Sequence, residues 1–291
     1  MASFKVLVAL AVVAGFALAT APAEADNNDI YNFAINIECL EAQYYQYAAY
    51  GEFRNASLLA GGPPATGGKK ALLSPGVEAI AAELARDETA HLAFLRSAAG
   101  AAAVPCPQID LVNSFPTVVK AALGSRAGNF NFSPYDNDIN FLLSAFLFED
   151  VDATAFAGAI PVLVGADAQA SAAGILGVEA YHGGLLRQVL FENVGIVVPP
   201  YNLQIVSIVQ ALSDLRGKLG GGMDEGITIP NATAAVYLPN ILDFFQANIV
   251  PADADARIFS RTPQEVLAIE YGNNASMPGG FFPAGFNGNI K

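Results

Sequence analysis

ELARDETAHLAFL, residues 83–95, and GILGVEAYHGGLLR, residues 174–187, share one feature: a glutamate stands three positions before a histidine. The pairs are Glu88 with His91 and Glu179 with His182, and the chain has no third histidine. Three residues are close to one helical turn, so the members of each pair lie on the same helix face. Apolar residues recur on that face at helical spacing. Both pairs should therefore be buried in a core, where polar groups need partners.

Two further helical stretches carry glutamates toward the same core. NFAINIECLEAQYY, residues 32–45, holds Glu38 and Glu41, and FLFEDVDATAFAGA, residues 146–159, holds Glu149. One Glu from each of two helices, with a Glu-x-x-His pair from each of two others, is the ligand pattern of di-iron and di-manganese four-helix bundles. The sequence therefore predicts an all-α four-helix bundle that binds two divalent metal ions, Fe or Mn.

The same residues have two weaker interpretations. A metal-free network of Glu–His hydrogen bonds would crowd four carboxylates around two imidazoles, and like charges in a low-dielectric core would force some protonation. A zinc site is disfavoured because the donors are rich in oxygen and include no cysteine. The ligand from the first helix stays open between Glu38, at the edge of the apolar stripe, and Glu41, nearer its centre.

The pattern along the chain divides it into three segments. We expect a leader at 1–25, the helical bundle at 26–220, and an irregular C-terminal extension packed on the bundle at 221–291. The main helices are expected at 28–53, 75–99, 138–160 and 166–194, where apolar residues have helical spacing and Gly or Pro marks the ends. Shorter helices are expected at 115–123, 202–218, 239–247 and 263–271.

The first residues have the features of a secretory signal peptide. Lys5 precedes an apolar run from Val6 to Leu18, and the small-residue site Ala23-Glu24-Ala25 follows. We expect cleavage after Ala25 and a secreted protein, extracellular or in the cell wall; the alternative is an uncleaved anchor. No later stretch is long and apolar enough to suggest a transmembrane segment.

Secretion bears on the cysteines and on glycosylation. Cys39 and Cys106, the only cysteines, would form one disulfide in an oxidising compartment or remain two buried thiols, and the sequence does not decide between these. The chain would be a glycoprotein if its sequons are used. They begin at Asn55, Asn131, Asn231 and Asn274.

Composition excludes several classes of protein. Of the 291 residues, 53% are hydrophobic and 14% are charged, which excludes a disordered acidic polymer. The net charge of −13 would repel nucleic acid and anionic membranes, so neither is expected as a partner. The oligomeric state stays open.

The motifs of the four core helices resemble those of the plant and algal desiccation-related proteins, which have a ferritin-like domain. RTPQEVLAIEYG, residues 261–272, and GGFFPAGFNGNIK, residues 279–291, resemble the C-terminal part of the same family. The resemblance runs from about Asp29 to Ile290 and implies a ferritin-like bundle, secretion or a cell-wall location, and an association with drying stress. It implies five metal ligands: Glu88, His91, Glu149, Glu179 and His182.

The resemblance also bears on the open choice in the first helix. Ferritins and rubrerythrins have a tyrosine seven residues after the first-helix ligand, and Tyr45 follows Glu38 by seven. Glu38 is therefore favoured as the ligand, which would leave Glu41 as a hydrogen-bond acceptor behind it.

Two functions are consistent with this site. The first is an oxidoreductase whose metal ions react with oxygen or peroxide, in ferroxidase, peroxidase or catalase-like turnover, with Tyr45 or Tyr44 able to pass an electron. The alternative is a non-enzymatic stress-protective or metal-sequestering protein that binds metal without turnover. A ferritin-type storage cage is disfavoured by secretion and by the long irregular tail.

Overall fold

The computed structural model describes residues 26–230 and 245–291, and helices account for most of them. The helices are α1 Asn27–Tyr50, α2 Pro75–Ala99, α3 Ser114–Leu123, α4 Asp138–Ala159, α5 Ala166–Glu192, α6 Ile205–Leu219 and α7 Pro263–Glu270. The strands are short: β1 Val197–Val198, β2 Leu203–Gln204, β3 Thr228–Pro230 and β4 Phe245–Ala247. The expected leader and the sequon at Asn231 lie outside the described residues.

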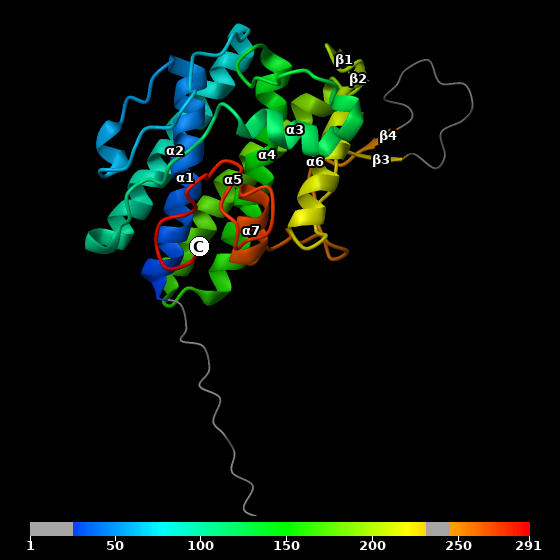
Figure 1. The fold of residues 1–291 in the computed structure, drawn as a ribbon. Helices are drawn as coiled ribbons and strands as arrows, with labels where there is room; N and C mark the ends of the chain where they lie inside the picture. The colour runs from blue at the N-terminus through cyan, green and yellow to red at the C-terminus, as the bar shows by residue number, and fades with distance from the viewer. Residues whose placement is uncertain (1–25, 231–244) are drawn as a thin grey trace, which may run out of the picture.

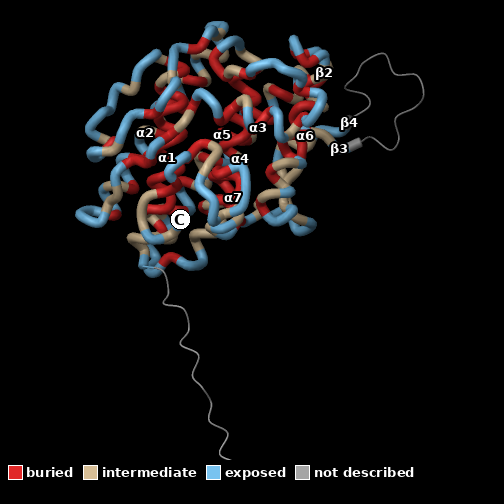
Figure 2. The backbone as a smooth tube through the Cα atoms, in the orientation of Figure 1, coloured by how far each residue is buried: buried red, intermediate tan, exposed pale blue. Residues whose placement is uncertain are grey.

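Two helix pairs form the bundle: α1 packs along α2, and α4 packs along α5, with α1 also contacting α4 (Figure 1). The predicted all-α bundle is confirmed. Helix α4 is buried on nearly all sides, because its sequence is apolar nearly all round. Buried segments gather where the helices meet, and exposed segments lie around them (Figure 2). None of the described helices is long and apolar enough to cross a membrane.

Local sequence explains where the main helices begin and end. The Asp26 side chain accepts a hydrogen bond from the Asn28 N–H at the start of α1, and Pro75 occupies the first turn of α2. Helix α1 ends at Tyr50, three residues earlier than expected. Gly51 follows with φ of 81°, a left-handed conformation that stops the helix.

The two short sheets lie outside the bundle core. β1 pairs with β2 in antiparallel register, Val197 opposite Gln204, and β3 pairs with β4, Thr228 opposite Ala247. The helix expected at 239–247 is wrong for residues 245–247, which form β4 because their backbone pairs with β3. The rest of that expected helix lies outside the described residues.

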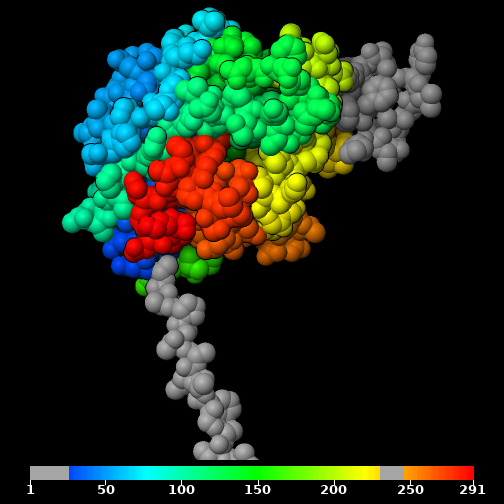
Figure 3. All heavy atoms as spheres, viewed as in Figure 1, coloured from blue at the N-terminus to red at the C-terminus, as the bar shows by residue number. Residues whose placement is uncertain are grey.

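The C-terminal residues pack on the bundle, as Figure 3 shows in orange and red. Helix α7 is stabilised by a capping box between Thr262 and Glu265. Further on, the buried Asn36 of α1 binds the Asn287 backbone twice, accepting from its N–H at 2.7 Å and donating to its carbonyl at 2.9 Å. Phe286 lies on Phe33, with ring centroids 5.2 Å apart. The tail is therefore fastened to α1.

A disulfide joins Cys39 on α1 to Cys106, in the segment between α2 and α3. The sequence allows either a disulfide or two free thiols, and the structure has the disulfide. Since Cys39 follows Glu38 directly, the crosslink anchors the turn of α1 that carries the candidate ligand.

Candidate metal centre

The inward faces of α1, α2, α4 and α5 bring the two histidines and four of the predicted glutamates to one place in the core. The donor atoms form two overlapping groups, and within each group all atoms lie within 4.8 Å of one another. The first group is Glu38, Glu88, His91 and Glu179; the second is Glu88, Glu149, Glu179 and His182. The four glutamates are 0% exposed, and the histidines are 8% and 5% exposed.

His91 directs its Nδ1 atom into the first group. This nitrogen lies 2.7 Å from Glu179 Oε1, 3.1 Å from Glu88 Oε2 and 3.7 Å from Glu38 Oε1. One imidazole nitrogen has at most one proton to donate, so it cannot satisfy three carboxylates by hydrogen bonding.

His182, which lies on α5 in the other helix pair, directs its Nδ1 atom into the second group. Its Nδ1 atom lies 3.0 Å from Glu88 Oε1, 3.2 Å from Glu149 Oε2 and 3.5 Å from Glu179 Oε2. Its other nitrogen, Nε2, lies 3.2 Å from an oxygen of Asp87, at the edge of the centre. An outer carboxylate in this position fixes the orientation of an imidazole and leaves Nδ1 free to bind a metal.

Glu88 and Glu179 each direct one oxygen toward His91 and the other toward His182. The ring centroids of the two histidines are 6.3 Å apart. A carboxylate that presents its two oxygens to two separate nitrogen donors is placed to bridge a pair of cations. Glu38 and Glu149 each belong to one group, so each would serve one cation.

Tyr45 lies on α1, and its hydroxyl donates a hydrogen bond to Glu149 Oε1. The Tyr45 side chain is fully buried, and burial with the neighbouring Glu149 carboxylate raises the pKa of this tyrosine well above its usual value. Tyr45 therefore stays a hydrogen-bond donor at neutral pH and holds Glu149 in position. Tyr44 points elsewhere and donates to the Phe141 carbonyl.

Burial and the neighbouring ionisable groups shift the pKa values of the carboxylates and imidazoles of the centre. Burial raises the pKa of Glu149 to about 8 and raises that of Glu38 well above its ordinary value. Burial opposes ionisation of Glu88, but the neighbouring imidazoles of His182 and His91 lower its pKa to about 2. Burial disfavours the charged form of His91, yet the nearby carboxylates of Glu179 and Glu88 raise its pKa to about 10. The pKa of His182 is also raised against burial, first by Glu149.

Buried carboxylate oxygens that accept no hydrogen bond indicate whether metal ions fit these residues. Both carboxylate oxygens of Glu38 accept no hydrogen bond from any described residue, although they are fully buried. Glu179 approaches both imidazoles closely but without hydrogen-bond geometry. Buried oxygens without donors are costly, and divalent cations would satisfy them. The donor set of four carboxylates and two imidazoles therefore fits a pair of Fe or Mn ions.

The structure places Glu38 and Glu41 differently; helical spacing alone left the choice between them open, and the family resemblance favoured Glu38. Glu38 lies beside His91, whereas Glu41 is grouped with Glu38 and Asp152 and with neither histidine. Asp152 was not among the predicted site residues, although a signal was present: it follows Glu149 by three, as His91 follows Glu88. Asp87 was also missed, because its partner His182 is remote in sequence.

A buried ion-pair network supports the outer side of α4. Asp150 accepts from Arg187 of α5 and from Arg216 of α6, each at 2.8 Å. Asp224 accepts from Arg216 and from Arg261, also at 2.8 Å. Because Asp150 directly follows Glu149, this network fixes the helix turn that presents Glu149 to the centre.

Comparison with known proteins gives three matches. The family model described as "Ferritin-like domain" matches residues 26–192, more than half of the chain. The chain is 32% identical over 269 residues to the ferritin-like catalase Nec2 of Nesocodon mauritianus, covering 90% of this chain and 84% of that protein. It is 32% identical over 244 residues to the desiccation-related protein PCC13-62 of Craterostigma plantagineum, covering 82% and 75%. No solved structure matches the chain.

Proposed function

The chain belongs to the ferritin-like domain family and is related to the desiccation-related proteins, and from this premise we propose that it is a dinuclear metal oxidoreductase that disproportionates hydrogen peroxide. In that reaction one peroxide is oxidised to dioxygen and a second is reduced to two waters, with no outside reductant. The relative named a ferritin-like catalase supports this choice of substrate. The relative named desiccation-related supports a role during drying stress.

One observation carries the proposal: two imidazole nitrogens each face three carboxylate oxygens in a closed core, and Glu88 and Glu179 reach both nitrogens. The two imidazole nitrogens cannot satisfy all six contacts by hydrogen bonding, since each nitrogen supplies one proton at most. Two divalent cations would satisfy this arrangement, with His91 and Glu38 as ligands of one ion, His182 and Glu149 as ligands of the other, and Glu88 and Glu179 available to both.

The chain's own residues set the conditions for the reaction. A bound metal pair would supply the two-electron redox chemistry and open positions for peroxide. Glu88 and Glu179 would contribute ligands to both ions. Tyr45 fixes Glu149 through its hydroxyl, and the closed apolar core around the centre excludes bulk water. Carboxylates suit both Fe and Mn, so the chemistry of the donors allows either ion.

Metal analysis together with oxygen evolution tests this function. The protein should bind at least two Mn or Fe ions per chain and release dioxygen from peroxide. Glu88→Gln and Glu179→Gln should lose metal and activity together. The matched control is Glu83→Gln, which removes an exposed carboxylate from the same helix as Glu88. Metal binding without dioxygen release would favour the non-enzymatic metal-sequestering alternative. Wild-type protein that takes up neither ion would refute the site itself.

We further propose that the protein is exported. The leader-like residues 1–25 support export, and so does the disulfide between Cys39 and Cys106, since disulfides persist in oxidising compartments. The mature protein from a eukaryotic secretory host should begin at or near Asp26, as mass spectrometry of the intact N-terminus would show. A secreted chain that keeps Met1, or one retained inside the cell, would contradict export by cleavage.

A further inference from the structure

The helices α1 and α4 each carry two acidic residues one turn apart. On α1 these are Glu38 and Glu41, and on α4 they are Glu149 and Asp152. The proposed dinuclear centre uses one residue of each pair, Glu38 and Glu149. The other two residues, Glu41 and Asp152, are 1% and 0% exposed and contact neither histidine at ligand distance. Two buried acids beside the centre are therefore left without a role.

These two acids meet Glu38. Oxygen atoms of Glu38, Glu41 and Asp152 lie within 4.8 Å of one another. Among the described residues, no backbone, amide or hydroxyl group donates a hydrogen bond to any oxygen of the three side chains. No described Lys or Arg forms an ion pair with them, and the buried arginines near α4 are engaged by Asp150 and Asp224. All six oxygens of these side chains are thus unpartnered among the described residues, and one oxygen of each side chain lies close to the other two.

The number of carboxylates in this part of the core is consistent with one more cation. Six carboxylates gather in this part of the core: Glu38, Glu41, Glu88, Glu149, Asp152 and Glu179. Two divalent ions at the proposed centre offset four negative charges and leave two. An uncompensated buried charge is strongly unfavourable, so the remaining pair requires one more divalent cation or two protons.

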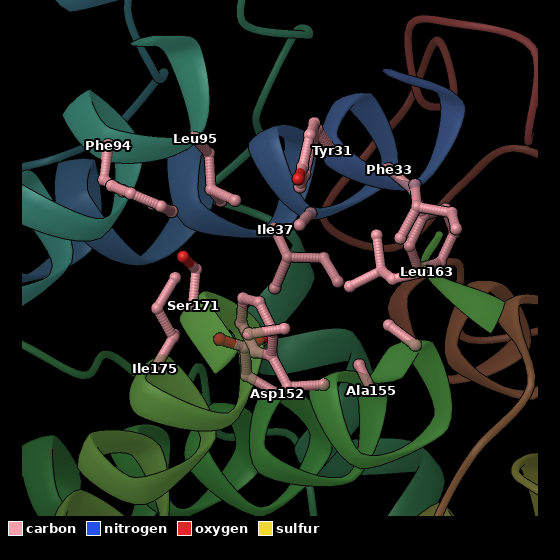
Figure 4. A pocket seen from close by; sticks show the side chains of 15 residues that line it. Tyr31, Phe33, Ile37, Phe94, Leu95, Asp152, Ala155, Leu163, Ser171 and Ile175 are labelled. Carbon is pink, nitrogen blue, oxygen red and sulfur yellow. The ribbon is translucent and has the colours of Figure 1, made fainter. Parts of the chain in front are cut away.

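A pocket beside Asp152 has room for water. Asp152 is the one acid of the three that lines this pocket, which lies between α1, α2, α4 and α5 and is otherwise mostly apolar (Figure 4). Its cavity volume is about 30 Å³. One water needs about 10–15 Å³ on this measure, so the pocket has room for about two waters. Hard divalent cations need several oxygen ligands, and water could complete a shell that the three carboxylates begin.

We propose that Glu38, Glu41 and Asp152 bind a third divalent cation through oxygen ligands alone, next to the dinuclear centre and sharing Glu38 with it. An all-oxygen site selects hard ions, namely Mn²⁺, Mg²⁺ or Ca²⁺, over ions that prefer nitrogen or sulfur. The inference rests on the proposed centre for its charge count, and the third ion has no assigned part in turnover.

Metal stoichiometry in single variants tests the proposal. Wild-type protein reconstituted with Mn²⁺ and freed of excess metal should contain three ions per chain by elemental analysis. Asp152→Asn and Glu41→Gln should each contain two and keep the electron paramagnetic resonance signal of the coupled pair. Glu83→Gln, an exposed acid on α2, should keep three. Excess Ca²⁺ should displace one Mn²⁺ from the wild type and none from Asp152→Asn.

The outcomes separate this proposal from the proposed function. Two ions in the wild type and two in Asp152→Asn would overturn the third site and leave the dinuclear centre standing. Three ions in both would place the third ion elsewhere and also overturn the proposal. No bound ion in the wild type would refute both. If Asp152→Asn fails to fold by circular dichroism, Glu41→Gln provides the same comparison from the other helix.

Discussion

Loading the metal-depleted protein with its first two Mn²⁺ ions at pH 7 should release about three protons per chain. Metal ligands must be deprotonated, and three of the six proposed ligands, His91, His182 and Glu149, hold protons at this pH. His91 has a pKa raised to about 10 by Glu179 and Glu88 against burial, and Glu149 has a pKa raised to about 8 by burial. The pKa of His182 is raised as well, first by Glu149.

The number of released protons also sets how strongly the metal-binding constant depends on pH. With about three protons released, the overall binding constant for two ions should fall by up to about 10³ when the pH drops from 7 to 6. That factor corresponds to about 4 kcal/mol of binding free energy. The sign follows from the raised pKa values: acid returns protons to the ligands and competes with the metal. The slope should flatten between pH 8 and 10, as Glu149 and then His91 lose their protons before metal arrives.

Isothermal titration calorimetry in buffers of different ionisation enthalpy measures the proton release directly. The Glu149→Gln variant removes one titrating ligand, so whatever metal it still binds should release about one proton fewer. The exposed Glu83→Gln variant should match the wild type. Release of fewer than about two protons by the wild type would show that the imidazoles are not the protonated ligands, and the proton count would be refuted.

Three further predictions test the surroundings of the centre. Asp87→Ala removes the carboxylate beside His182 Nε2 and should weaken metal binding by about 10- to 100-fold in a chelator competition. Asp150→Ala leaves Arg187 and Arg216 short of a buried partner and should lower the free energy of unfolding by about 3–5 kcal/mol in urea denaturation. The metal-depleted protein should lose stability from pH 5 to pH 9, because the raised pKa values of Glu149, about 8, and His91, about 10, contribute stability at low pH that is lost as pH rises toward and through them.

Each of these has a result that would contradict it. Unchanged affinity in Asp87→Ala would mean that His182 is oriented by packing alone. A loss below about 1 kcal/mol in Asp150→Ala would mean that water replaces the missing carboxylate at the arginines. For the pH prediction, Glu149→Gln should show a shallower decline than the wild type, since its pKa of about 8 lies inside the window. An equal decline in both proteins would assign the effect to other groups.

Much of the architecture was predictable from local pattern. The four main helices appear where apolar spacing and end signals predicted them, within a few residues at their ends. The ferritin-like resemblance is also confirmed, by the family match over residues 26–192. The roles of the six ligands, the segment boundaries and export of the chain stay predictions.

Other features depended on how remote segments meet. The pairing of Cys39 with Cys106 requires the segment before α3 to return to α1. Residues 245–247 form a strand because β3 supplies the partner, which a local pattern does not reveal. Asp87 and His182 are 95 positions apart in the sequence, so no local sequence pattern predicts their contact.

The sequence by itself determined which residues share a helix face. A turn of 3.6 residues places Glu88 with His91, and Glu179 with His182, whatever the rest of the chain does. Only the tertiary structure decided which turns face one another. α1 is buried on nearly every side, so its own periodicity could not choose between Glu38 and Glu41. The rotation and offset of α1 against α2 and α4 place Glu38, and not Glu41, beside His91, and they depend on side-chain packing between helices.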